Sequence, residues 1–256
     1  MAAKFTNDPE FNDAIKKPSS GRRFTLLKFL GVLGIIALVI ALLLPAYRSA
    51  GPAARRAQCT NNLKQIALAL QNYQQEYKAL PPAYTVDAKG RPLHSWRTLI
   101  LPYLEQGSLY KTIDLSKPWN DPANAKALQT YVPVFNCPAA AGPQNTTTYL
   151  AIAGPNGCLI PAASRRLAEI TDAHSWTLMV IEAGEENAVP WMAPVDAGES
   201  LVLSLGPTTK LHHEGGTNAG FVDGSVQFIK ANTPTSVRRA LMSISGNDDE
   251  VAKGKE

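Results

Sequence analysis

Histidine and carboxylate side chains that could ligate a metal lie close together in the last quarter of the chain. His212, His213 and Glu214 are consecutive, and Asp223 follows after a short, mostly apolar run. Imidazole nitrogens and carboxylate oxygens are common ligands of Zn²⁺. Successive residues of an extended chain point to opposite sides, so His212 and His213 are poorly placed to bind one ion. We therefore predict neither a metal nor a cofactor here.

A turn is the structure that this stretch favours. Glycines 215 and 216 permit unusual backbone dihedrals. The pair Asp223-Gly224, inside the alternating residues 218–230, is typical of a hairpin with a two-residue type I′ turn. The polar residues of this region form a candidate binding turn: His213, Glu214, Asn218 and Asp223.

Signatures of catalysis are missing from the sequence. It contains no nucleophile elbow, zinc-protease motif, P-loop or dinucleotide fingerprint. Asp172, His174 and Ser175 bring the residue types of a catalytic triad close in sequence, as do His94 and Ser95, but a triad is defined by geometry. We interpret both groups as loop caps and predict that the protein is not an enzyme.

Two further sets of residues have a functional and a structural interpretation. Glu182, Glu185 and Glu186 could bind calcium, but no loop of spaced oxygen ligands surrounds them, so we predict a solvated acidic turn. Trp96 and Trp119 could line a recognition groove. Large aromatic residues usually belong to the core, and we favour that interpretation.

The three cysteines leave their pairing open. Outside the cytoplasm, a bridge between Cys137 and Cys158 would close a short loop and contribute about 3 kcal/mol. Alternatively, these two residues and Cys59 are small buried side chains without a bridge.

A long helix over residues 24–77 must position the rest of the chain. Its first half, from Phe24 to Leu44, has one charged residue, Lys28, and an estimated length of about 32 Å, the thickness of a bilayer core. Lys28 lies one turn from the start, where its long side chain can reach the headgroups. Pro45 then removes a helical hydrogen bond and is expected to kink the helix or end it at the membrane surface. Phe24, Lys28, Leu44 and Pro45 therefore mark the predicted membrane anchor.

The second half, residues 45–78, is predicted to be an amphipathic stem. Its apolar residues recur at helical spacing, which places Leu63, Ile66 and Leu70 on one face for packing. The opposite face carries polar residues: Asn62, Lys64, Gln65, Gln71 and Gln74. The prolines at 81 and 82 end the pattern, so the helix should stop near Lys78.

The head, residues 79–245, is predicted to be an α+β domain in which the stem packs on a mostly antiparallel sheet. The strand candidates are residues 149–153, 176–182 and the hairpin at 218–230. Residues 95–110 favour a helix that is broken at Pro102. Residues 1–23 and 246–256 have no sustained apolar pattern and are predicted to be a flexible cytoplasmic tail and a disordered tail.

Charge distribution bears on partners and orientation. The net charge of +4 is dispersed over the 256 residues, which argues against a nucleic-acid partner. Basic residues before the apolar segment favour a cytoplasmic N-terminus and a head on the other side of the inner membrane, in the periplasm or outside the cell.

The start of the apolar helix, Phe24-Thr25-Leu26-Leu27 with Pro45 at its far end, resembles type IV pilins and type II secretion pseudopilins. That resemblance implies other pilin-like subunits or envelope proteins as partners. Those families resemble one another in having a Gly directly before the Phe and a Glu four residues after it, whereas this chain has Arg23 and Lys28 at these positions. We therefore expect no proteolytic cleavage before Phe24.

Further motifs follow one another along the chain: Arg55-Arg56-Ala57-Gln58-Cys59-Thr60-Asn61-Asn62-Leu63-Lys64-Gln65-Ile66, Leu80-Pro81-Pro82, Ser95-Trp96-Arg97, Leu101-Pro102-Tyr103-Leu104-Glu105-Gln106, Pro118-Trp119, Phe135-Asn136-Cys137-Pro138, His213-Glu214-Gly215-Gly216-Thr217-Asn218 and Phe221-Val222-Asp223-Gly224-Ser225-Val226. Through them the chain resembles the bacterial family catalogued as domain of unknown function 1559.

Two hypotheses about function follow. The first is a membrane-anchored, pilin-like structural or interaction protein of the bacterial envelope, linked to a type II secretion or type IV pilus-like system. The alternative is an anchored ligand-binding or enzymatic domain outside the cytoplasm, with its site in the tryptophan-rich loops and the turn from His212 to Asp223.

Overall fold

The computed structural model describes residues 20–246 and residue 251, with side chains described except at 20–27 and 39–50. The predicted tails therefore lie largely outside the described residues. Two compact units make up the chain, Met1–Gly51 and Pro52–Glu256.

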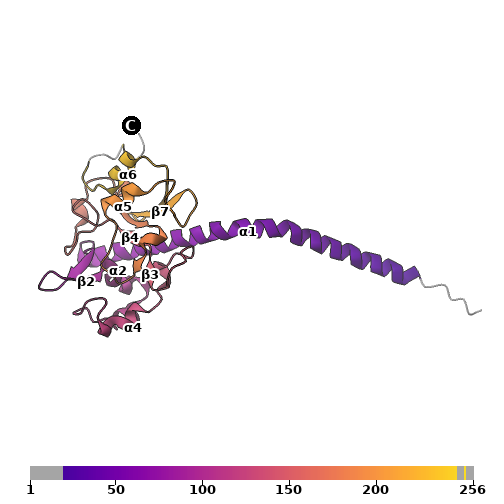
Figure 1. Cartoon of the computed structure of the whole chain (residues 1–256), viewed down its shortest axis with the longest axis horizontal. Helices are drawn as coiled ribbons and strands as arrows, with labels where there is room; N and C mark the ends of the chain where they lie inside the picture. Colours follow the sequence, from indigo (N-terminus) through magenta and orange to yellow (C-terminus); the bar gives the residue numbers. More distant parts are fainter. Residues whose placement is uncertain (1–19, 247–250, 252–256) are drawn as a thin grey trace, which may run out of the picture. The chain divides into compact units, whose positions relative to one another are not determined.

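One helix, α1, runs from Ser20 to Tyr77 and carries the first 58 described residues (Figure 1). It begins four residues before the predicted start at Phe24, and its backbone stays helical through Pro45. It ends as expected next to Lys78, which has a left-handed conformation with φ of 60°. The long N-terminal helix is thus part of the observed fold.

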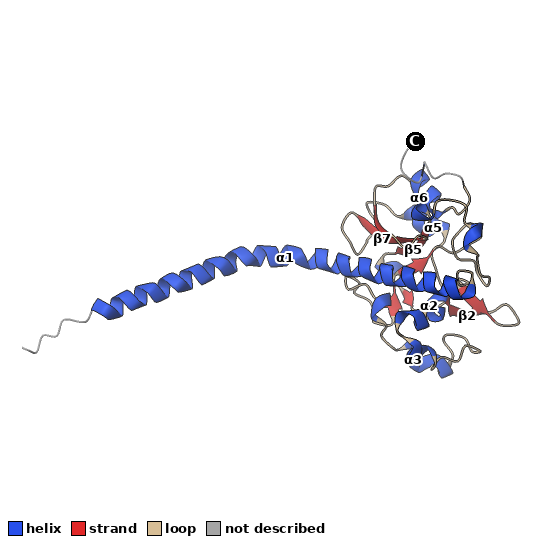
Figure 2. Cartoon of the chain, turned by 180° about the vertical axis from the view of Figure 1, so that it is seen from behind, coloured by secondary structure: helices blue, strands red, loops and turns tan. Residues whose placement is uncertain are grey.

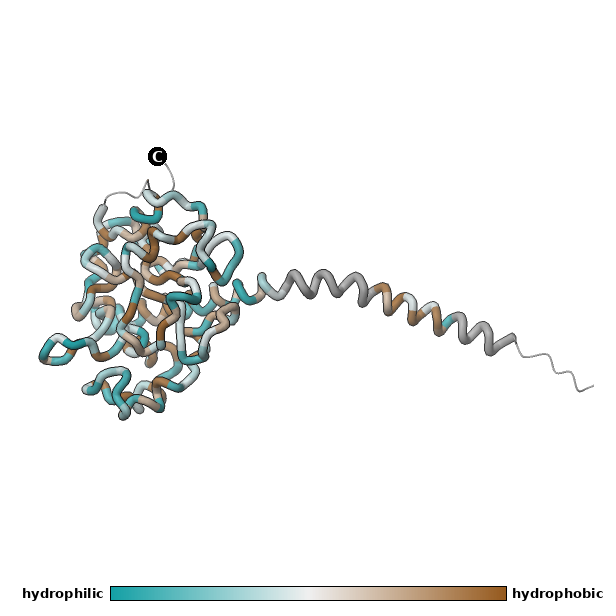
Figure 3. Tube along the Cα trace, in the orientation of Figure 1, coloured by the Kyte–Doolittle hydropathy of each residue, from teal (hydrophilic) through white to brown (hydrophobic). Residues whose placement is uncertain are grey.

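In the first unit, the described side chains of α1 are those of residues 28–38, and all are exposed. Figure 3 shows an apolar colour over much of this stretch. Within the described part of the chain, no helix has the combined length and apolar character required to cross a membrane. The predicted span from Phe24 to Leu44 includes many residues whose side chains are outside the described set.

In the second unit, α1 buries one face in the head. Leu63, Ile66 and Leu70 are fully or almost fully buried. The predicted polar face is not wholly in water, however. Asn62 is buried and donates a hydrogen bond of 3.0 Å to the carbonyl of Asn136. Gln71 is half-buried, whereas Lys64 and Gln65 are exposed.

The main sheet has four antiparallel strands in the order β4-β5-β7-β8. They are β4 (Tyr149–Ala151), β5 (Leu178–Glu182), β7 (Gly216–Phe221) and β8 (Val226–Lys230). Every residue of β5 is buried, because the strand lies between two others and both its faces are covered. The structure confirms the α+β class and the antiparallel sheet.

Alternate residues of the strands enter two separate cores. Tyr149 and Ala151 face the cluster that includes the stem residues, whereas Leu150 and Ile152 face a second cluster. The second cluster is closed by α5 (Glu199–Ser204) and α6 (Thr235–Met242), two helices that the sequence analysis did not predict (Figure 2). The sheet is therefore covered by the stem on one face and by α5 and α6 on the other.

The rest of the head is built from short elements. Two more antiparallel pairs join β1 (Tyr84–Val86) to β2 (Pro92–Ser95) and β3 (Thr146–Thr147) to β6 (Val189–Pro190). The predicted helix over residues 95–110 is three pieces. The first break precedes Pro102, which cannot donate the backbone hydrogen bond of a continuous helix, and the second is at Glu105, which is left-handed with φ of 58°. The short helices are α2 (Trp96–Leu99), η2 (Leu101–Leu104), α3 (Gly107–Tyr110), η3 (Pro122–Asn124), α4 (Ala125–Leu128), η4 (Pro133–Phe135), η5 (Leu167–Glu169), η6 (His174–Trp176) and η7 (Glu185–Asn187).

The turn between β7 and β8 differs from the predicted type I′ turn. That turn requires positive φ at both central residues, but Gly224 has φ of 86° and Asp223 is not among the described residues with positive φ. The N–H of Gly224 donates to the carbonyl of Phe221, and the N–H of Phe221 donates to that of Ser225. The hairpin therefore has a longer connection that closes with a left-handed glycine.

Candidate functional site

A disulfide joins the stem to the loop after η4. It links Cys59 and Cys137, which are 78 residues apart in sequence and have Cα atoms 5.3 Å apart. Sequence analysis left open a bridge between Cys137 and Cys158 or three unbridged cysteines, and neither alternative is observed, because the stem brings Cys59 to Cys137. A loop of this length gives a chain-entropy stabilisation of about 4.5 kcal/mol.

Cys158 is a free thiol in the core. Its Sγ donates a hydrogen bond of 2.9 Å to the carbonyl of Leu178 at the start of β5. Burial raises the pKa of this thiol to about 12. Cys158 is therefore a small buried hydrogen-bond donor rather than a nucleophile.

Glu182 lies at the end of β5 and is only 1% exposed. The Nδ2 atom of Asn218 donates a 2.8 Å hydrogen bond to its Oε2. The other carboxylate oxygen, Oε1, is buried and has no hydrogen-bond partner among the described residues. The predicted solvated acidic turn is therefore wrong for Glu182, because pairing of β5 with β7 draws its side chain inside.

His213 faces Glu182 across this site. Its Nε2 atom is 3.3 Å from Oε2 of Glu182 and 3.9 Å from Sγ of Cys137. An isolated antiparallel β-bridge pairs His213 with Gly216 and holds the histidine at the start of β7, with Gly215 in a left-handed conformation. A Cβ atom at Gly216 would clash with the backbone carbonyl oxygen of Ile229 and lie 2.7 Å from the ring of Phe228, so this position requires glycine.

Together these four side chains form what we call the Cys-His-Glu cluster: Cys59, Cys137, Glu182 and His213. All four are buried, and the potential ligand atoms lie within 4.8 Å of one another. In the oxidised state the sulfurs bond to each other. In the reduced state the same residues offer two thiols, an imidazole and a carboxylate, which are ligand types of zinc sites.

Two surface cavities reach the cluster at His213. One, of about 440 Å³, is also lined by Arg55, Arg56 and His212. The other, of about 570 Å³, passes Gly215 and Gly216. His213 is thus the residue of the cluster that both cavities touch.

The candidate binding turn is split by the fold. His213 and Asn218 point into the cluster region and are buried, whereas Glu214 and Asp223 are exposed. Asp223 accepts a 2.8 Å hydrogen bond from the N–H of Ser225 and so caps the hairpin turn.

His212 lies away from the cluster. Its Nδ1 is 3.8 Å from a carboxylate oxygen of Glu185, which itself accepts the N–H of Ala141. The two adjacent histidines therefore have different partners.

The tryptophans do not line a groove. Trp96 and Trp191 are buried, and their ring N–H groups donate to Asp196 and to the carbonyl of Thr130. Trp119 is partly buried against the same core. Because these rings are core residues, the tryptophan-lined site of the alternative hypothesis is not assembled.

A second cluster of buried polar groups is centred on the ion pair between Arg97 and Asp196. Their closest atoms are 2.8 Å apart, and both side chains are almost completely inaccessible. Arg97 also donates to the carbonyls of Tyr149, Ala193 and Val195. This pair ties α2 to β4 and to the segment after β6, and the sequence analysis did not identify it.

Three of the residues considered for a catalytic triad, His94, Ser95 and Asp172, have structural partners. Ser95 accepts the N–H of Arg97 as the N-cap of α2, and His94 bonds to the carbonyl of Lys117 at 2.7 Å. Burial lowers the pKa of His94. Asp172 accepts the N–H of Gly246 at 2.8 Å.

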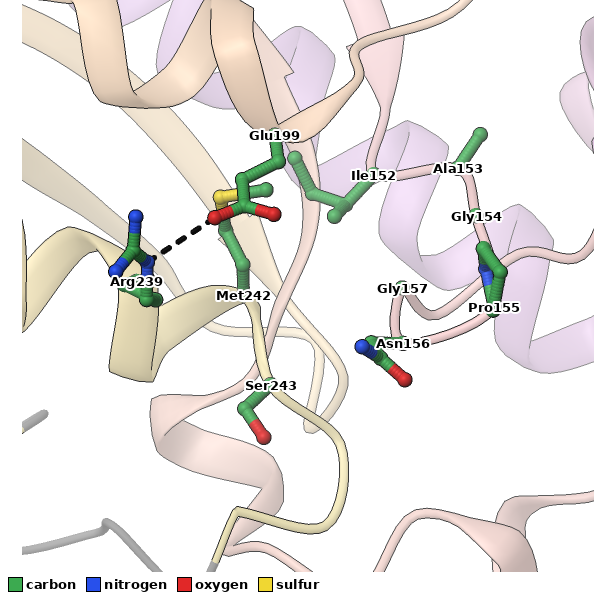
Figure 4. A pocket seen from close by; sticks show the side chains of 10 residues that line it. All are labelled: Ile152, Ala153, Gly154, Pro155, Asn156, Gly157, Glu199, Arg239, Met242 and Ser243. Carbon is green, nitrogen blue, oxygen red and sulfur yellow. Dashed lines mark hydrogen bonds and ion pairs between the residues drawn. The ribbon is translucent and has the colours of Figure 1, made fainter.

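A separate open cavity of about 400 Å³ lies between the loop after β4 and the helices α5 and α6 (Figure 4). Its charged residues, Glu199 and Arg239, form an exposed ion pair of 3.0 Å. Because these charges neutralise each other, the cavity has no obvious charged anchor for a ligand.

Comparison with known proteins gives one match. Residues 48–201, more than half of the 256 residues, match the profile of a family described as "Protein of unknown function (DUF1559)". No curated protein and no solved structure matches the chain.

Proposed function

Because the chain belongs to this family of proteins of unknown function, we propose its role from its own features: a single-pass, membrane-anchored, pilin-like structural or interaction protein of the bacterial envelope. The head is in the periplasm or outside the cell, and the N-terminus is in the cytoplasm. The protein acts through contacts with other pilin-like subunits or envelope proteins of a secretion or pilus-like system, and not as an enzyme.

The apolar surface of α1 between residues 28 and 38 carries this proposal. Its large side chains are between 45% and 64% exposed: Phe29, Leu30, Val32, Leu33, Ile35, Ile36 and Leu38. At about 100° per residue they surround the helix, so packing against one partner surface would leave others in water. A helix that is apolar on all sides favours a lipid bilayer or the interior of a large assembly. In sequence, the apolar run extends from Phe24 to Leu44.

The disulfide supports a head outside the cytoplasm. Disulfides persist in oxidising compartments and are rare in the reducing cytosol. The bond between Cys59 and Cys137 joins the stem to the head. In an oxidising compartment outside the cytoplasm it would persist and stabilise this junction.

A structural role agrees with the polar groups of the head. The buried Arg97 pairs with Asp196 and backbone carbonyls, and the tryptophans belong to the core. These groups stabilise the fold and do not converge on an open, tryptophan-lined ligand site.

Membrane fractionation tests the anchor. The full chain, expressed in a bacterium with a C-terminal tag, should pellet with inner membranes, resist carbonate extraction and dissolve in detergent. Deletion of residues 24–44 should move the chain to the soluble fraction. The double variant Ile35→Glu/Ile36→Glu should do the same, because each charge costs about 2–3 kcal/mol or more in a bilayer.

Leu68→Glu is the matched control. Leu68 is 56% exposed but lies on the stem, outside the apolar run, so this variant should remain with the membranes. Protease added to spheroplasts should digest the tagged head and leave cytoplasmic markers intact. A full chain found in the soluble fraction, or a head protected from protease, would contradict the proposal.

A further inference from the structure

We propose that the Cys-His-Glu cluster is a zinc site whose formation is controlled by the redox state of its cysteines. With the disulfide intact, the sulfurs cannot act as thiolate ligands. When the disulfide is reduced, Cys59 and Cys137 bind Zn²⁺ together with His213 and Glu182.

The disulfide alone does not account for the polar groups beside it. A buried carboxylate is costly unless it is paired and hydrogen-bonded. Glu182 is 1% exposed and its Oε1 has no hydrogen-bond partner among the described residues. A disulfide is neutral and donates no hydrogen bond, so it leaves that oxygen unsatisfied. A metal ion bound through Oε2 would neutralise this buried carboxylate, whose Oε1 otherwise has no partner among the described residues.

The distances suit a tetrahedral ion. Zinc bonds of about 2.0–2.3 Å place neighbouring ligand atoms about 3.3–3.8 Å apart. Nε2 of His213 is already 3.3 Å from Oε2 of Glu182 and 3.9 Å from Sγ of Cys137. After reduction, the two sulfurs must separate from the bonded distance of about 2 Å to about 3.8 Å, which rotation of the cysteine side chains can provide.

Surrounding residues orient the carboxylate. Asn218 donates to Glu182, and its own Oδ1 accepts a 3.3 Å hydrogen bond from the hydroxyl of Thr60, the neighbour of Cys59. Such hydrogen bonds to a ligand typically change metal affinity by about 10–100-fold. The cavities that reach His213 provide a route for the ion.

The chemistry involves two balanced steps. A water-soluble trialkylphosphine reduces the disulfide: phosphorus gives two electrons to the sulfur–sulfur bond, water supplies the oxygen of the phosphine oxide, and two thiols form. Zn²⁺ then displaces one proton from each thiol. Two thiolates, a carboxylate and a neutral imidazole carry three negative charges, which the ion reduces to one.

Cobalt titration of the full chain in detergent tests the proposal. Oxidised chain should bind no Co²⁺ in the cluster. Chain reduced with the phosphine under anaerobic conditions should bind one Co²⁺ per molecule, with the visible bands of tetrahedral Co²⁺ and a near-ultraviolet sulfur-to-cobalt band. Added Zn²⁺ should abolish both signals, and a chromophoric chelator should then report one bound zinc.

The adjacent histidines provide matched variants. His213→Gln should weaken Zn²⁺ binding by more than about 100-fold, beyond the effect of losing an outer hydrogen bond. His212→Gln should bind as the wild type does, because His212 faces Glu185. Likewise, Cys137→Ser should weaken the sulfur-to-cobalt band to half or less, because Cys59 is then the one remaining sulfur ligand, and Cys158→Ser should retain the full band.

Circular dichroism distinguishes loss of the site from loss of the fold. If the reduced chain stays folded without metal, titration decides directly. If it unfolds, Zn²⁺ should restore the native spectrum in the wild type and not in His213→Gln. The proposal is wrong if the reduced wild type binds no more metal than Cys137→Ser, if both histidine variants bind equally, or if excess Zn²⁺ fails to refold an unfolded reduced chain.

Discussion

Replacing Ile66 with alanine should destabilise the head by about 3–5 kcal/mol. Ile66 is completely buried between the stem and the sheet, in the cluster that includes Met179 and Val180 of β5. Loss of three carbons costs about 2.4 kcal/mol in transfer free energy, and the cavity adds to this. The disulfide at Cys59 fixes the stem two helical turns away, so the helix cannot move freely to fill the space. We therefore expect the upper part of the usual 2–5 kcal/mol range.

Urea denaturation of the full chain in mild detergent, with the disulfide intact, measures this effect. With a slope of about 2–3 kcal/mol/M, the midpoint should fall by about 1–2.5 M. Gln65→Ala is the control, because Gln65 is exposed one residue away, and it should change the stability by less than about 0.5 kcal/mol. Equal midpoints for the two variants would refute the reasoning, and the apolar face of the stem would then have to pack against another subunit.

Three other predictions concern separate parts of the chain. Arg97→Ala should cost about 3–5 kcal/mol at about pH 7, because it leaves Asp196 buried without its partner. Burial already raises the pKa of Asp196 and loss of Arg97 raises it further, so lowering the pH protonates this carboxyl and should shrink the free-energy cost of the substitution. The prediction is wrong if the urea midpoints of variant and wild type differ equally at about pH 7 and about pH 4.5. Cys158 should resist alkylation in the native chain and react once the chain is unfolded, which mass spectrometry can follow; labelling of the native chain at neutral pH would show that the thiol is not buried. The mature protein should not begin at Phe24, since Arg23 occupies the position of the expected glycine, and intact mass with N-terminal sequencing of membrane-purified protein would reveal an unexpected cut.

Local periodicity was sufficient to predict the largest elements. The long helix was evident from its apolar spacing, and its end next to Lys78 from the following prolines. Strand β5 was predicted from a run of β-branched and apolar residues, which is typical of a strand buried on both faces. These features depend on neighbours within a few residues, so sequence alone could determine them.

Short elements were less predictable because tertiary contacts stabilise them. Helices α5 and α6 have six and eight residues, too short to be stable alone, and they form where their apolar side chains cover the second face of the sheet. The hairpin was predicted correctly, but its turn was not, since several turn types accept Asp-Gly and strand pairing selects among them.

The candidate site was decided by the tertiary structure. Cys59 comes from the stem, Cys137 from a loop, Glu182 from the end of β5 and His213 from the start of the hairpin. Sequence analysis had considered each residue separately, named only Cys158 as a possible partner of Cys137 while leaving the pairing open, and assigned Glu182 to the solvent. Side-chain chemistry determined what each residue can ligate, but only packing of the stem against the sheet brought together groups that are far apart in the chain.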